Sequence, residues 1–162
     1  MSVHGLFSDS ELKAMQQIAG RYEEPASAIL PLLHFVQEAR GHLGENELVY
    51  VADFLQVPHV RAYEVATYYT MFTIKPRGRH VIQVCRNLSC TMGGAEQILE
   101  RLTGELGVGV GETTADGLFS IVEVECIGAC DLAPAIMIDE ELHGRVAPET
   151  LPEILGAYRV KK

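Results

Sequence analysis

Four cysteines constrain the structure of this 162-residue chain more than any other feature of its sequence. They form two pairs, Cys85 and Cys90 with four residues between them, and Cys126 and Cys130 with three. Each pair follows directly on a predicted strand, because the segment HVIQVC ends at Cys85 and FSIVEVEC ends at Cys126. Two neighbouring strand ends can deliver four sulfur atoms from adjacent loops to one point. The sequence therefore predicts a metal site at a sheet edge.

Three kinds of site use four cysteines. Structural disulfides belong to oxidising compartments, and the opening segment MSVHGLFSDSE lacks the pattern of a secretory signal, so the sequence disfavours them. Structural zinc usually takes tight C-x2-C knuckles, and neither pair has that spacing. A 2Fe-2S cluster needs two thiolates on each iron, and these longer loops leave room for it. We favour the 2Fe-2S cluster, with structural zinc and disulfides as the alternatives.

The residues around the cysteines agree with an iron-sulfur site. Gly128 and Ala129 are small, so the backbone can approach sulfur and donate hydrogen bonds, although simple turn geometry also explains them. No histidine lies inside either pair, which argues against a Rieske centre. The glycine-rich run at 107–111 does not match the G-x-G-x-x-G dinucleotide fingerprint. We identify no catalytic residues and expect no complete active site on this chain alone.

Composition excludes several classes of partner. The net charge of −9 would repel nucleic acid and anionic lipid surfaces. No segment approaches the ~20 apolar residues of a membrane span, so we expect no direct membrane insertion. With 48% apolar residues, the chain can fill a hydrophobic core without crosslinks. We expect a folded cytoplasmic protein.

Helical periodicity dominates residues 1–74 and predicts a four-helix bundle as the first domain. Ser8 and Glu11 have capping-box spacing, Pro25 suits the first turn of a second helix, and Pro58 separates the last two. The residues expected to face inward are Leu12, Met15, Ala19 and Tyr22 in the first helix, Ile29, Leu32, Leu33 and Val36 in the second, Leu48, Val51, Ala52 and Leu55 in the third, and Ala62, Val65, Ala66, Tyr69 and Phe72 in the fourth.

Strands mixed with helices follow over residues 75–162, which we predict to be a second, α/β domain. The polar turn at 75–78 marks the boundary. Besides the two strands that end on cysteines, PAIMID is a strand candidate, and helical spacing recurs over 94–106 and 148–158. The fold class expected for the whole chain is α+β.

Three segments that contain or adjoin these features resemble the thioredoxin-like 2Fe-2S family, represented by the 24 kDa subunit of respiratory complex I. They are ATYYTMF at 66–72, VCRNLSCTMGGAEQIL at 84–99 and VECIGACDLAPAIMID at 124–139. The resemblance covers most of the chain. It implies a thioredoxin-like second domain in which Cys85 and Cys90 hold one iron and Cys126 and Cys130 the other. It also implies that Pro134 follows a cis peptide bond, at the position where thioredoxins keep a cis-proline.

The resemblance further implies an electron-transfer subunit in the NADH-oxidising module of NADH:quinone oxidoreductase. A lone cluster moves one electron at a time, so FMN and NADH are expected on a partner, the flavin- and NADH-binding subunit, beside other iron-sulfur subunits. Such a complex would hold the chain at the cytoplasmic face of the inner membrane. A low reduction potential is expected, since plant-type centres lie near roughly −400 mV.

Other functions use the same features. Similar chains serve NAD-linked hydrogenases and formate dehydrogenases, and a free-standing ferredoxin or redox sensor would also need the cluster. A protein of another class, a structural zinc module with a helical docking surface, is the main alternative. Docking would use Tyr68, Tyr69, Met71 and Phe72, because such residues are enriched in interface cores. The competing interpretation places these four residues in the core of the bundle.

Overall fold

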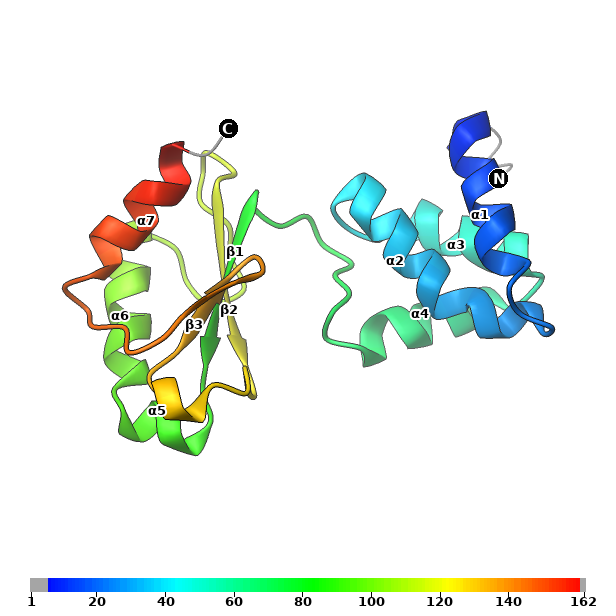
Figure 1. Ribbon diagram of the computed structural model, residues 1–162. Coiled ribbons are helices and arrows are strands. Elements are labelled where there is room, and N and C mark those ends of the chain that lie inside the picture. The colour runs from blue at the N-terminus through cyan, green and yellow to red at the C-terminus, as the bar shows by residue number, and fades with distance from the viewer. Residues whose placement is uncertain (1–5, 161–162) are drawn as a thin grey trace. The chain divides into compact units, whose positions relative to one another are not determined.

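A computed structural model describes residues 6–160 of the chain (Figure 1). The chain divides into two compact units, the first ending at Pro76 and the second beginning at Arg77. Each unit has a hydrophobic core of its own. Together they give a mixed α/β fold. No helix among the described residues combines the length and the apolar character needed to cross a membrane.

The first unit is helical. Its elements are α1 (Asp9–Ala19), the 3-10 helix η1 (Pro25–Ala28), α2 (Ile29–Arg40), α3 (Glu45–Leu55) and α4 (His59–Tyr68). Pro31 stands in the first turn of α2, where a missing N–H costs little, so the α-helix starts only after the 3-10 turn. Gly41 ends α2 with a φ of 79°, a left-handed conformation that glycine adopts without steric cost.

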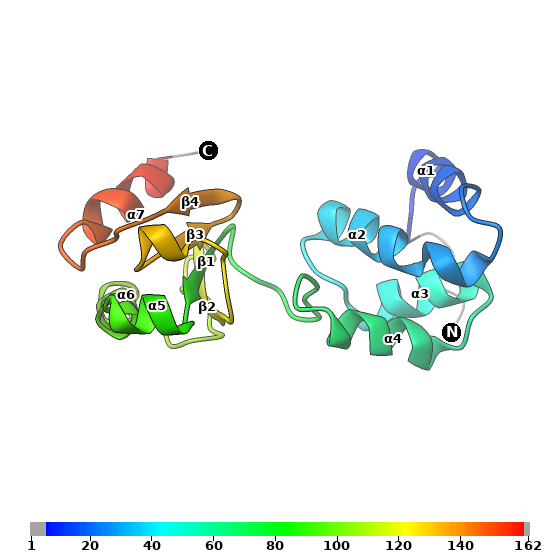
Figure 2. The ribbon, with the colours of Figure 1, turned by 60° about the horizontal axis from the view of Figure 1, so that its bottom comes forward.

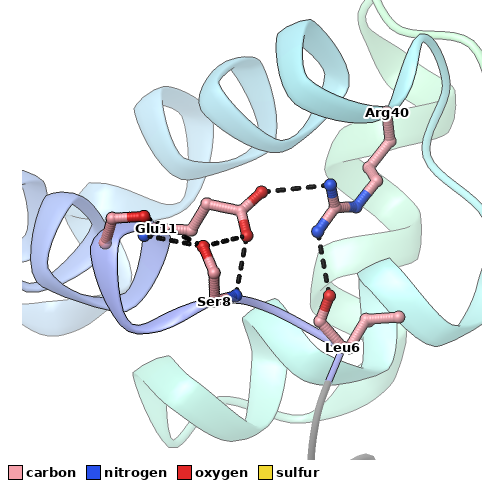
Figure 3. Close-up of polar contacts among 5 residues, drawn as sticks. Leu6, Ser8, Glu11 and Arg40 are labelled. Atoms are coloured by element: carbon pink, nitrogen blue, oxygen red, sulfur yellow. Dashed lines mark hydrogen bonds and ion pairs between the residues drawn. The ribbon is translucent and has the colours of Figure 1, made fainter.

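The predicted capping box at the start of α1 is confirmed. The Ser8 side chain accepts a hydrogen bond from the Glu11 N–H, and the Glu11 carboxylate accepts one from the Ser8 N–H at 2.7 Å. Arg40 joins this corner to α2, with its guanidinium 3.0 Å from Glu11 and donating to the Leu6 carbonyl at 2.9 Å (Figure 3). These bonds lower the pKa of Glu11, the bond from the Ser8 backbone contributing most.

Most of the inward-facing residues predicted for these helices are buried, including Met15, Leu32, Val51 and Ala62. Two predictions are wrong. Tyr22 lies beyond the end of α1 and is exposed, because the helix stops at Ala19. Tyr69 lies beyond the end of α4 and is also exposed, because α4 ends at Tyr68.

The second unit is built on a four-stranded sheet in the order β2-β1-β3-β4. Its strands are β1 (His80–Cys85), β2 (Phe119–Val124), β3 (Ile136–Ile138) and β4 (Glu141–His143). Strands β1 and β2 are parallel, while β3 is antiparallel to both β1 and β4. The strands predicted from HVIQVC, FSIVEVEC and PAIMID are confirmed, whereas β4 was not predicted.

Helices α6 (Ala95–Leu106) and α7 (Leu151–Val160) cover the same face of the sheet (Figures 1 and 2). Their buried residues, such as Ile98, Leu102 and Leu155, pack with the sheet residues Ile82 and Ile121 in one core. Two shorter elements, α5 (Leu88–Met92) and the 3-10 helix η2 (Cys130–Leu132), stand in the loops that carry cysteines. The predicted cis peptide bond between Ala133 and Pro134 is confirmed.

Candidate metal centre

The parallel pairing of β1 and β2 explains how Cys85 and Cys126 come together. The register pairs Cys85 with Val124, so both strands end at the same edge of the sheet. The Arg86 N–H then donates to the Val124 carbonyl at 3.0 Å, which keeps the two chains side by side beyond the strands. Cys126 follows two residues after Val124 and reaches the side chain of Cys85.

The entry of the chain into β3 brings Cys130 to the same place. The Cys85 N–H donates to the Ala135 carbonyl at 3.4 Å, so the segment after η2 runs beside the end of β1. Cys90 lies on α5, which follows Cys85 directly, and it interacts with both Cys85 and Cys130. Figures 1 and 2 show α5 and the segment of η2 as neighbours at this end of the second unit.

The four thiols differ in their exposure to water. Cys85 and Cys90 are buried in the core of the second unit, with 3% and 2% of their surface exposed. Cys126 and Cys130 are exposed, and all four cysteines are free thiols. The site therefore has one pair of sulfurs shielded from water and one pair at the surface.

Backbone N–H groups face the sulfur atoms. The Gly128 N–H donates to Cys126 Sγ at 3.3 Å, from a loop in which Gly128 has a φ of 83°. Burial acts to raise the pKa of the Cys85 thiol, but hydrogen bonds from the Asn87 and Ile127 N–H groups and from two neighbouring cysteines outweigh it, and the pKa is lowered. Donors of this kind favour the thiolate form, which is the form that binds metal.

Cys90 shows the opposite shift. Burial raises the pKa of its thiol, and the negative charge developing on Cys85 and Cys130 raises it further, against the lowering effect of the Ala135 N–H. Ionisation of Cys85 therefore makes ionisation of Cys90 less favourable when no cation lies between them. A bound cation removes this effect, because the thiolates then neutralise it instead of repelling each other.

This donor set fits an iron-sulfur group. A 2Fe-2S cluster takes four cysteine thiolates, and hydrogen bonds to the sulfurs are its usual environment. Among residues 6–160, no three His, Cys, Asp or Glu side chains are close enough to surround one metal ion. A two-iron cluster makes a different demand, since each iron takes only two protein ligands.

A family model for thioredoxin-like [2Fe-2S] ferredoxins matches residues 15–159. The chain belongs to this family. Its cofactor is accordingly one 2Fe-2S cluster, and the resemblance inferred from the three sequence segments is confirmed.

Two curated relatives are each covered over most of their length. A subunit of the NADH-quinone oxidoreductase of Pseudomonas aeruginosa is 37% identical over 153 residues, covering 94% of this chain and 92% of the relative. A subunit of the enzyme of the same name from Rhizobium meliloti is 41% identical over 145 residues, covering 90% of this chain and 86% of the relative.

Among solved structures, an NAD+-reducing [NiFe]-hydrogenase in the H2-reduced state superposes with a TM-score of 0.74 at 21% identity. The match covers 86% of this chain and 23% of the hydrogenase chain, so this chain spans less than a quarter of that larger protein. At this identity the similarity establishes a shared fold.

Sequence reasoning located the cysteines but missed the structure between the first pair. The sequence predicts helical spacing only over 94–106, whereas the structure forms a separate helix before it, α5, with Cys90 at its centre. Asn87 caps this helix by accepting a hydrogen bond from the Leu88 N–H at 2.8 Å. An asparagine at this position is an N-cap signal that could have predicted it.

Proposed function

We propose that Cys85, Cys90, Cys126 and Cys130 hold the 2Fe-2S cluster and that the chain is an electron-transfer subunit in the NADH-oxidising module of NADH:quinone oxidoreductase. The observation that carries the ligand assignment is the meeting of two segments at a single point, the one from the end of β1 with Cys85 and Cys90 and the one after β2 with Cys126 and Cys130. The relatives from Pseudomonas aeruginosa and Rhizobium meliloti support the assignment to that enzyme.

The residues of the chain would keep the electron carrier in a defined environment. When bound, the cluster would supply one-electron transfer. The core around Cys85 and Cys90 shields these two ligands from water. The N–H groups of Asn87, Ile127 and Gly128 donate to the cysteine sulfurs and would stabilise the extra negative charge of a reduced cluster, which would raise its reduction potential.

The substrate and flavin would be bound elsewhere in the assembly. FMN and NADH belong on the flavin- and NADH-binding subunit in this proposal, and other iron-sulfur subunits carry electrons onward. The whole assembly would work at the cytoplasmic face of the inner membrane.

The helical unit would contribute a docking surface. We take residues 1–74 as a four-helix bundle and 75–162 as the cluster domain. Tyr68, Tyr69 and Met71 are exposed, whereas Phe72 is buried, so three of the four residues considered for docking are available to a partner. Tyr68 and Tyr69 also line a cavity of about 940 Å³ with Arg61 and Glu64.

Replacement of one ligand tests the assignment. Cys126→Ala removes an exposed thiolate and leaves the core of the second unit in place, so we expect loss of the cluster with the first unit still folded. Iron and acid-labile sulfide are measured on the anaerobically purified full chain, and far-ultraviolet circular dichroism reports the helices. The matched control is Ser89→Ala, a half-buried residue beside Cys90. A Cys126→Ala protein with full iron and sulfide content would overturn the assignment.

The equivalent small subunit of an NAD-linked hydrogenase or formate dehydrogenase is the alternative within the same class of function. The hydrogenase superposition is compatible with it. The electron acceptor of the purified native complex distinguishes the two, since quinone reduction by NADH supports the first function and NAD+ reduction by hydrogen supports the second.

A further inference from the structure

An ion pair joins the two segments that carry the cysteines. Arg86 directly follows Cys85, and Glu125 directly precedes Cys126. Nη2 of Arg86 lies 2.8 Å from Oε1 of Glu125. The two side chains are 56% and 79% exposed, and ion pairs this exposed contribute little to stability. The position of the pair between two proposed ligands therefore points to an electrostatic role.

The backbone of Arg86 fixes the place of its charge. The Arg86 N–H donates to the Val124 carbonyl at the end of β2, at 3.0 Å. The Arg86 carbonyl accepts a hydrogen bond from Thr91 Oγ1 on α5, at 3.1 Å. Arg86 is thus anchored to both β2 and α5, and α5 also carries Cys90.

The charges along these two segments are unequal. Over 84–92 and 123–131 the sequence has one basic residue, Arg86, and three acidic residues, which are Glu123, Glu125 and Asp131. The pKa of Arg86 is raised, first by the hydrogen bond with Glu125, so the guanidinium stays charged. A reduced cluster carries one more negative charge than an oxidised one. A positive charge nearby therefore favours reduction, and a negative charge disfavours it.

We infer that Arg86 and Glu125 set the reduction potential of the cluster through their charges, Arg86 raising it and Glu125 lowering it. The inference rests on the proposed function, because it needs the cluster at the four cysteines. Both are positioning residues, since they act on the ligands through space and do not bind the cluster themselves. Because both charges are exposed, dissolved salt screens their effect.

The test measures the midpoint potential of the anaerobically purified full holo chain at low salt, by redox titration followed with electron paramagnetic resonance. Arg86→Gln leaves the Glu125 carboxylate unpaired. We expect the ratio of reduced to oxidised cluster at a fixed solution potential to fall by about twofold or more. Glu125→Gln leaves the guanidinium unpaired, and the ratio should rise by a similar factor. The double variant should return close to the unmodified chain, and both single shifts should shrink as salt is added.

Two further variants separate charge from structure. Arg86→Lys keeps the positive charge and should keep the potential close to that of the unmodified chain. Arg101→Gln is the matched control, because it breaks a comparable ion pair, 3.2 Å from Glu105 within α6, a helix without cysteines. It should leave the potential unchanged.

The sign of the shifts decides the inference. If Arg86→Gln and Glu125→Gln shift the potential in the same direction, the pair acts as a structural clamp and the inference is wrong. It is also wrong if neither variant differs from Arg101→Gln. Should Arg86→Gln lose its iron, Glu125→Gln decides alone, because a clamp predicts the same loss there and a charge effect predicts an upward shift. An unmodified chain without iron and sulfide would instead overturn the proposed function, on which this inference depends.

Discussion

Asp139 ties two parts of the second unit together through one carboxylate. It accepts a hydrogen bond from the Val81 N–H at 3.0 Å and one from His80 Nδ1 at 2.7 Å. His80 is buried between Phe119 and Tyr158. Asp139 has a φ of 55°, a left-handed conformation that aspartate and asparagine tolerate better than most residues. The turn between β3 and β4 is thereby fastened to the start of β1.

Substitution at Asp139 tests this contact. We expect Asp139→Ala to lower the free energy of unfolding by about 1–3 kcal/mol, because it leaves a backbone N–H and a buried imidazole without their acceptor. Asp139→Asn should cost less, since its amide oxygen keeps one acceptor. Denaturant unfolding measures both. The control is Asp53→Asn, which loses an exposed 2.6 Å pair with His59 and should change stability by less than about 1 kcal/mol. Equal losses at the two sites would contradict this role of Asp139.

At the scale of elements, the segment after β4 holds the loop that carries Cys130. The Arg145 N–H donates to the Leu132 carbonyl at 2.6 Å, and the Val146 N–H donates to the Pro134 carbonyl at 3.1 Å. Gly144 packs so closely that a Cβ there would lie 2.5 Å from Leu132 Cβ. Only glycine allows the backbone at position 144 to pack this closely against Leu132. The segment after β4 therefore holds η2 in place.

Two glycine substitutions of opposite expected sign test that support. Gly144→Ala should lower the unfolding free energy by about 1–3 kcal/mol, because Leu132 must move, and should reduce the iron content by displacing Cys130. Gly156→Ala lies in α7 with no atom within 4 Å of the added Cβ, and it should raise stability by about 0.5–1 kcal/mol. Thermal unfolding and iron analysis measure both. A neutral Gly144→Ala would show that the contact does not hold the loop.

The success of sequence reasoning differed between the elements. Helices α1 to α4 could be predicted because buried residues such as Leu32 and Val51 recur at helical spacing, and α1 also begins with a capping box. Strand β4 could not, because Glu141 and Leu142 are exposed and three residues carry no periodic pattern. The pattern likewise placed Tyr22 and Tyr69 inward because spacing does not say where a helix ends.

The candidate site, too, could be predicted only in part from the sequence. The sequence located Cys85, Cys90, Cys126 and Cys130 because their spacing is visible along the chain. It could not show which pair is buried, since that depends on the parallel pairing of β1 with β2 and on the run of the chain into β3. The sequence also did not show that Leu88 and Met92 on α5 are exposed, because this depends on Cys90 of the same helix being buried.

At the scale of the whole molecule, the chain has two units, and each unit has a hydrophobic core of its own. The core residues of the first unit lie between Phe7 and Phe72, and those of the second between Ile82 and Tyr158. All four cysteines belong to the second unit. The first unit has the exposed tyrosines that we propose contact a partner, and the second has the cysteines that we propose hold the cluster.

The central claim is that these four cysteines hold two irons and two sulfides. A native mass spectrum of the anaerobically expressed full chain tests it most directly, because the mass above that of the polypeptide identifies the bound group. We predict an increment equal to two irons plus two sulfides, lost in the Cys126→Ala variant. An increment of a single zinc, or a bare chain with oxidised cysteines, would contradict it.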